Sequence, residues 1–128
     1  GTNGGSDDVN VVINNSGNTN TVDVNVGTSA SEVDDVDIDV DISGGSNTVT
    51  VNENSTASSV SDKITNIDIT GGSNTVTATK TGAAQHDTTI DHTGSSSTIS
   101  VTQSGAEAST VDLTTDGSSS TVTITVAD

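Results

Sequence analysis

The chain has 128 residues, a net charge of −16 and 27% hydrophobic residues, with no Phe, Trp, Tyr, Met, Cys or Pro. The missing cysteines exclude a disulfide framework, no apolar run is long enough to span a membrane, and the acidic balance argues against binding to nucleic acid or to anionic membranes. Low hydrophobicity with high charge is typical of disordered chains, but the dominance of Val, Ile and Thr favours β-strands.

The sequence consists of five copies of one repeat. The heptad GGSNTVT occurs at residues 44–50 and again at 71–77, and looser copies lie on either side. Every copy has a glycine with an aliphatic residue five positions after it and another four positions before it. The glycines, separated by 27, 27, 23 and 23 residues, are Gly17, Gly44, Gly71, Gly94 and Gly117.

Within each copy, polar and apolar residues alternate with a period of two, which predicts strands, and no stretch has helical periodicity. Residues 1–8 precede the repeats as an N-terminal segment, and the first copy runs over 9–26. The second copy alternates over 37–42 and, after its glycine, over 48–51. The last copy ends on an alternating strand at 121–126. Each copy therefore predicts a strand, a glycine-containing arc, a second strand and a second arc.

The second arcs differ in length along the chain. The arcs at 27–35 and 54–62 have nine residues, whereas those at 81–85 and 104–108 have five. Because the extra residues fall in the arcs, we expect the strands to keep their register from copy to copy.

Two short strands cannot bury a core alone, but stacked copies can, with neighbouring strands about 4.8 Å apart. We therefore predict an all-β fold, a β-solenoid of five coils with two short strands and 23–27 residues per coil, in which residues 9–128 form one domain. Two inward aliphatic columns should face each other across the core. One is Ile13, Val40, Ile67, Ile90 and Leu113, and the other is Val22, Val49, Val76, Ile99 and Val122.

A polar column follows the glycines and consists of Asn20, Asn47 and Asn74, continued by Ser97 and Ser120. One interpretation is a ladder that binds a ligand. The favoured interpretation is a structural ladder whose side chains close the arc by hydrogen bonding from coil to coil.

The main charge cluster lies on one predicted strand, from which Asp37, Asp39 and Asp41 point outward, and stacking places Asp68 next to Asp41. Like charges directly opposite each other are destabilising, and hard cations with oxygen ligands relieve the repulsion. These four aspartates are therefore candidate ligands for calcium or another cation. The favoured alternative is a solvated acidic face, and no other cofactor is expected.

Both lysines fall in inward columns at strand ends. Lys80 stacks between Glu53 in the preceding coil and Gln103 in the next, which predicts a Glu53–Lys80 ion pair, with placement for solubility as the alternative. Lys63 lies beside the second arc, close to Asp62. His86 and His92 have no Cys or HExxH context, so the sequence favours packed ladder residues over metal ligands.

The fourth copy, HTGSSSTISVTQSG, carries His92, Gly94, Ser97, Ile99 and Gln103, and the glycine and asparagine recur at residues 44 and 47 and at 71 and 74. Over nearly the whole chain this pattern resembles curlin, the repeat protein of bacterial curli fibres. In the two columns where curlin has glutamine, other residues stand at nine of the ten positions, with aliphatic residues at four of them and His92 in place of one glutamine. Those columns are Asn15, Ile42, Ile69, His92, Thr115 and Val26, Glu53, Lys80, Gln103, Val126.

The resemblance implies a structural protein of an extracellular or cell-surface amyloid-like filament, as in a biofilm matrix. Neither end of the predicted solenoid has an obvious polar cap, so we expect homopolymeric head-to-tail self-association. The alternative is a β-solenoid shaft or an adhesin or phage-fibre binding module, stabilised by cations, with the long arcs at 27–35 and 54–62 as its contact surface. No GxSxG motif or paired base is present, and no carboxylate is expected in a deep apolar pocket, so no enzymatic activity is predicted.

Overall fold

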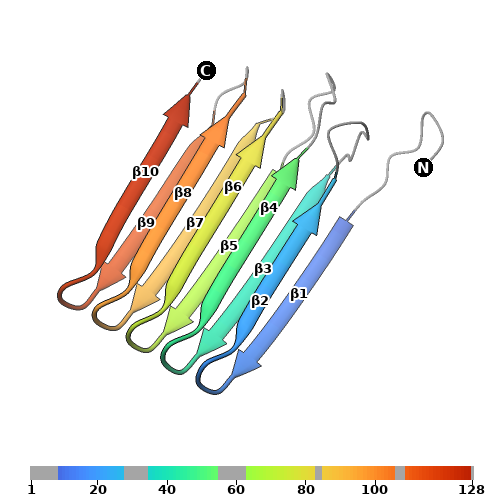
Figure 1. Cartoon of the computed structure of the whole chain (residues 1–128). Helices are drawn as coiled ribbons and strands as arrows, with labels where there is room; N and C mark the ends of the chain where they lie inside the picture. The colour runs from blue at the N-terminus through green and yellow to red at the C-terminus, as the bar shows by residue number, and fades with distance from the viewer. Residues whose placement is uncertain (1–8, 28–34, 55–62, 83–84, 106–108, 128) are drawn as a thin grey trace.

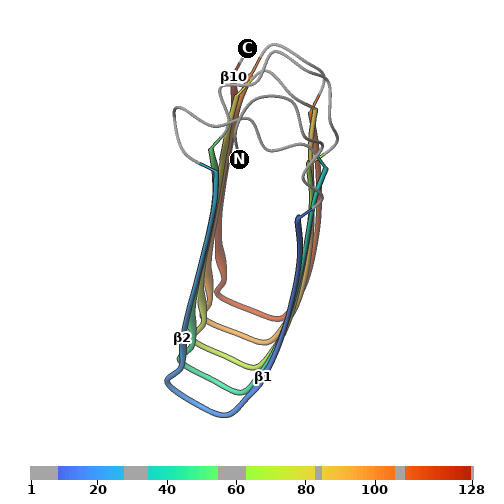
Figure 2. The ribbon, with the colours of Figure 1, turned by 90° about the vertical axis from the view of Figure 1, so that its right-hand side faces the viewer.

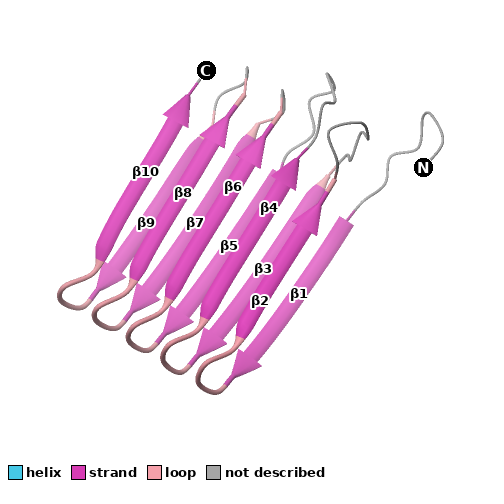
Figure 3. Ribbon diagram, in the orientation of Figure 1, coloured by secondary structure: helices cyan, strands magenta, loops and turns pink. Residues whose placement is uncertain are grey.

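The computed structural model describes residues 9–27, 35–54, 63–82, 85–105 and 109–127. In these ranges the chain passes alternately through two parallel sheets, and all of the regular elements are strands (Figures 1 and 3). The odd-numbered sheet has the order β1-β3-β5-β7-β9, and the even-numbered sheet has the order β10-β8-β6-β4-β2. The strands are β1 (Val9–Ser16), β2 (Thr21–Val26), β3 (Val36–Ser43), β4 (Thr48–Asn54), β5 (Lys63–Thr70), β6 (Thr75–Thr81), β7 (His86–Thr93), β8 (Thr98–Ser104), β9 (Thr110–Asp116) and β10 (Thr121–Ala127).

This arrangement confirms the predicted five-coil β-solenoid with two strands per coil. The register is the one expected from the repeat: Val40 pairs with Ile13 on one side and Ile67 on the other. Ile90 continues the same column to Leu113, although the spacing between the copies has shortened. The difference in arc length therefore does not shift the strands. Residues 1–8, 28–34, 55–62, 83–84, 106–108 and 128 lie outside the described residues.

The repeated glycine is explained by the arc that joins the two strands of a coil. Gly44 has φ +118°, and a Cβ at this position would lie 2.3 Å from the carbonyl oxygen of Gly17 in the preceding coil. At Gly71, a Cβ would lie 2.3 Å from the carbonyl oxygen of Gly44. No larger residue fits where the arcs stack so closely, which is why glycine recurs at this position of the repeat.

The core lies between the two sheets, which face each other when the stack is viewed end on (Figure 2). Because side chains alternate along a strand, every second residue points inward. Val40, Ile67 and Ile90 in one predicted column are fully buried, as are Val49 and Val76 in the facing column. Burial of these β-branched side chains is the main term that stabilises the stack.

At the two ends of the stack, burial is less complete than the sequence predicted. Ile13 and Leu113 are only partly buried against the core. Val122 was expected to be buried, but it is 39% exposed. β10 is an edge strand, and no further described coil covers this side chain, whereas Val22 on the opposite edge strand, β2, is 7% exposed.

Candidate functional site

The asparagine column forms a hydrogen-bonded ladder along the arcs. The Asn20 N–H donates to Asn47 Oδ1 at 2.8 Å, and the Asn47 N–H donates to Asn74 Oδ1 at 2.8 Å. Ser97 Oγ then accepts the Asn74 N–H at 3.1 Å, and Ser120 Oγ accepts the Ser97 N–H at 3.4 Å. Each side-chain oxygen thus bonds the backbone of the preceding coil, which favours the structural interpretation of this column.

The ion pair predicted between Glu53 and Lys80 is present, and it is buried. The two residues pair directly across β4 and β6, and Lys80 Nζ lies 3.6 Å from Glu53 Oε1. Their side chains are 0% and 1% exposed, with Lys80 the more buried. The Thr65 hydroxyl donates to Glu53 Oε1, and Lys80 Nζ donates to the Asp87 carbonyl oxygen at 2.6 Å. Each charge therefore has an opposite charge and a neutral partner, as a buried pair requires.

Gln103 continues this polar column into the next coil. Its Nε2 donates to Thr88 Oγ1 at 2.9 Å and to the His86 carbonyl oxygen at 3.2 Å. Sequence reasoning missed Thr65 and Thr88, which bind the charged column from the opposite sheet. The available signal was the break that they make in an otherwise aliphatic inward column, Val11, Ile38, Thr65, Thr88 and Val111.

Both histidines point into the core, as the sequence favoured. His86 Nε2 lies 3.4 Å from the Gly82 carbonyl oxygen. His92 is 1% exposed and stacks between Ile69 and Thr115. Among the described residues neither ring nitrogen of His92 has a hydrogen-bond partner. His92 therefore contributes a packed ring with unsatisfied polar atoms.

Two sequence predictions concern residues that are only partly described. The backbone of Lys63 pairs in register with Val36 and His86. The Lys63 side chain and Asp62 lie outside the described residues, as do most of the long arcs at 27–35 and 54–62.

The aspartates are arranged as the register predicted. Asp68 pairs with Asp41 on one side and with Asp91 on the other. Asp39 pairs with an asparagine, and Asp37 pairs with Asn10 and Ile64. In the described part of the chain, no three His, Cys, Asp or Glu side chains gather in a group that could hold a metal ion. The reason is geometric, because successive outward residues on one strand are about 6.7 Å apart.

Asp68 lies in the aspartate column between Asp41 and Asp91. Burial, followed by the neighbouring carboxylates of Asp41, Asp91 and Asp39, raises the pKa of Asp68 above its ordinary value. An open groove of about 430 Å³ includes Asp41 and Asp68 in its lining, together with polar residues such as Thr70. The arrangement is a solvated acidic face under mild repulsive strain.

The end coils combine unpaired strand edges with exposed aliphatic side chains. Each sheet ends in strands that pair on one side only, β1 and β9 in the odd-numbered sheet and β2 and β10 in the even-numbered sheet. On β10 the inward-register residues Val122, Ile124 and Val126 are 39%, 45% and 51% exposed. Unpaired strand edges beside exposed aliphatic side chains are a template for pairing with another chain.

Comparisons of the chain with protein-family models, with curated proteins and with solved structures find no match. The resemblance to curlin therefore stays a prediction. None of the described residues forms a helix long and apolar enough to cross a membrane.

Proposed function

We propose that this protein is a structural subunit that stacks head to tail through its end coils into a filament, acting by self-association rather than by catalysis. The observation that carries the proposal is that the two ends of the solenoid are complementary. The resemblance to curlin supports an amyloid-like filament at the cell surface or in the extracellular matrix.

The hydrogen-bond ladders support this proposal because they run in one direction. In the described residues, Asn20 Oδ1 has no preceding coil from which to accept an N–H, and the Ser120 N–H has no following coil to which to donate. The arcs repeat this polarity, since the Gly94 N–H donates to the Asp116 carbonyl oxygen at 2.8 Å. In a second copy stacked in continuing register, Ser120 and Gly117 meet Asn20 and Ser16.

The side chains of the two ends are also compatible in that register. Continuing the observed columns places Leu113 on Ile13 of the next copy, and it places the exposed aliphatic residues of β10 on the valines of β2. Val122 then lies on Val22, and Val126 lies on Val26. The apolar surface newly buried is mainly that of β10, because the valines of β2 are already buried in the single chain. Each Å² of apolar surface buried this way contributes roughly 25 cal/mol.

The acidic residues of the described strands do not repel each other directly at this junction. Asp112 would lie on Val12 of the next copy and Asp116 on Ser16, while Thr123 would lie on Asp23. Among the described residues, no two acids would stand directly opposite each other at the junction, unlike Asp41, Asp68 and Asp91 inside the chain. Stacking therefore adds less direct repulsion than the solenoid already contains.

Electron microscopy of the purified protein tests the proposal, because it requires unbranched filaments of indefinite length. Ile124→Lys should abolish them, since it buries an ammonium group at the junction without a partner. Val12→Lys is the matched control, because Val12 is also an exposed aliphatic residue on an end coil, 60% exposed, but points outward. Val12→Lys should form filaments as the wild type does.

A mixing experiment tests the polarity of assembly. Ile124→Lys keeps an intact first coil, so it should add to the growing fifth-coil end of a wild-type filament and then block it. A small fraction of this variant should therefore shorten wild-type filaments. Discrete wild-type particles at every concentration would contradict the proposal and favour the shaft or adhesin alternative. Normal filaments of Ile124→Lys would contradict the stacking register.

A further inference from the structure

The outer faces of the two sheets differ in charge. The odd-numbered sheet carries its acids on the outward positions of β3, β5, β7 and β9, where they alternate with the buried residues. These are Asp37, Asp39, Asp41, Asp68, Asp87, Asp91, Asp112 and Asp116. On the even-numbered sheet, Asp23 is the one acidic residue among the described outward side chains. A chain of net charge −16 therefore keeps one broad face nearly uncharged.

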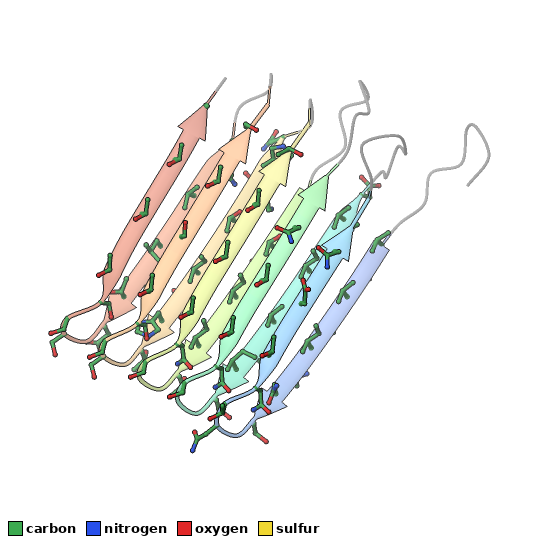
Figure 4. All side chains as sticks on the ribbon, viewed as in Figure 1. Carbon is green, nitrogen blue, oxygen red and sulfur yellow. The ribbon has the colours of Figure 1, made fainter. Side chains whose placement is uncertain are left out.

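That face is covered with threonine in register. One column contains a threonine in every coil, and all of its members are exposed. A second column continues from Asp23 through threonine and serine, and a third continues from two asparagines into threonine. The first column is Thr21, Thr48, Thr75, Thr98 and Thr121; the second ends in Thr50, Thr77, Ser100 and Thr123; the third ends in Thr79, Thr102 and Thr125. Figure 4 shows these short oxygen-bearing side chains in rows across the even-numbered sheet.

The geometry of the sheet makes this a two-dimensional lattice. The strands of each sheet lie nearly behind one another in Figure 2, so the sheet has little twist. Equivalent threonines repeat at about 4.8 Å from strand to strand and at about 6.7 Å along a strand. Threonine is β-branched and stiff at χ1, so its hydroxyl and methyl groups repeat with the backbone.

We propose that this threonine face, defined by the three columns above, binds ice. On one prism plane of hexagonal ice, the oxygen atoms repeat at two perpendicular spacings close to those of the threonine lattice. A flat array of hydroxyl and methyl groups can join such a lattice of water, because each hydroxyl replaces a water in hydrogen bonding while the methyl groups fill the spaces between. A nearly uncharged face matches a neutral crystal surface, whereas the acidic face of the odd-numbered sheet holds its own hydration water.

Two other occupants fit this face less well. A second copy packed face to face would bury threonine hydroxyls in a dry interface, where unsatisfied hydroxyls are destabilising. Proteins usually bind a crystalline polysaccharide through aromatic side chains that stack on the sugar rings, and this chain has no aromatic residue. In the filament proposed above, Thr121 would stack on Thr21 of the next copy and lengthen the lattice, but ice binding requires only the single chain.

Partition into slowly growing ice tests the inference, with serum albumin as the excluded reference and amino-acid analysis as the readout. The decisive variant is Thr77→Lys, on β6 in the centre of the threonine face. The matched control is Thr89→Lys, a half-buried mid-strand threonine on the outer face of β7. Both variants make the same substitution, and circular dichroism checks that both stay folded.

We expect the wild type and Thr89→Lys to be enriched several-fold in the ice fraction over albumin, and Thr77→Lys to fall to the albumin level. Exclusion of the wild type from ice would overturn the inference, and so would equal losses in the two variants. Dimers or binding to cellulose powder that Thr77→Lys abolishes, without ice enrichment of the wild type, would assign the face to those occupants instead. Filament formation is measured separately by electron microscopy. A negative result for ice binding therefore does not contradict the proposed filament, and a negative result for filaments does not contradict ice binding.

Discussion

The buried pair of Glu53 and Lys80 offers the sharpest test of how the coils are held together. Replacing Lys80 by Met keeps the volume of the side chain but removes the ammonium group that pairs with the buried Glu53 carboxylate. At the 3.6 Å separation of the two charges, their attraction is about 4–5 kcal/mol for an effective dielectric constant near 20. Removal of one partner of a buried pair destabilises by about 3–5 kcal/mol. This loss is a large part of the 5–15 kcal/mol that roughly spans domain stabilities.

The double variant Glu53→Met/Lys80→Met is the control. It removes both charges, and it leaves the Thr65 hydroxyl and the Asp87 carbonyl without these partners, at about 1 kcal/mol or somewhat more each. We expect the double variant to lie within about 2–3 kcal/mol of the wild type, so the coupling energy of the pair is several kcal/mol. Urea unfolding followed by circular dichroism, at concentrations below filament formation, measures all four members of the cycle. Additive losses, or a loss below about 1 kcal/mol for Lys80→Met, would refute the account of a tightly coupled buried pair.

The remaining predictions concern the side chains of His92 and Asp68. His92→Ile should stabilise the protein by about 1–2 kcal/mol in urea unfolding, because it removes unpartnered ring nitrogens from the core, and a loss of stability would contradict this. Asp68→Asn should stabilise by about 0.5–1 kcal/mol at neutral pH, whereas Asp37→Asn, which faces no acid in register, should change little. The pKa of Asp68 is raised in the folded state, so the folded state holds this proton more tightly than the unfolded state does. The contribution of Asp68 to the free energy of unfolding therefore falls as the pH rises from the ordinary pKa to the raised pKa. Acidification restores it. Asp68→Asn should remove that slope. At matched ionic strength, Na⁺ should stabilise the wild type as well as Ca²⁺ does if the face is only solvated, and a specific gain with Ca²⁺ would instead support a calcium site at the aspartates.

The stacking of the coils could be predicted from the sequence because a parallel register turns sequence offset into spatial contact. Val40 meets Ile13 and Ile67 at offsets of 27, and Lys80 meets Glu53 at the same offset. The period of two within each strand then decides which side chains face the core. These two periodicities are enough to place the columns without any knowledge of the loops.

The remaining features depend on three-dimensional distances that cannot be calculated from the sequence separation of the repeats. Thr65 binds Glu53 across the core, and this contact depends on how one sheet lies over the other. The exposure of Val122 depends on which coil is last. A column lines up carboxylates from successive strands, whereas a cation needs several of them to converge on one point, and no group of three is found in the described part of the chain.

The distribution of polar residues inside the core also bears on what the ends do. The charged column holds Glu53, Lys80 and Gln103 in the three inner coils, where each finds a partner in a neighbouring coil or in the opposite sheet. In the first and last coils the same column holds Val26 and Val126. A charged residue in an end coil would be solvated in the free subunit and buried without a partner on stacking, which is destabilising by several kcal/mol. Valine at both ends removes this penalty from a junction. In the single chain Val126 is 51% exposed, so stacking would bury aliphatic surface of β10 that otherwise stays in water, whereas Val26 is already buried.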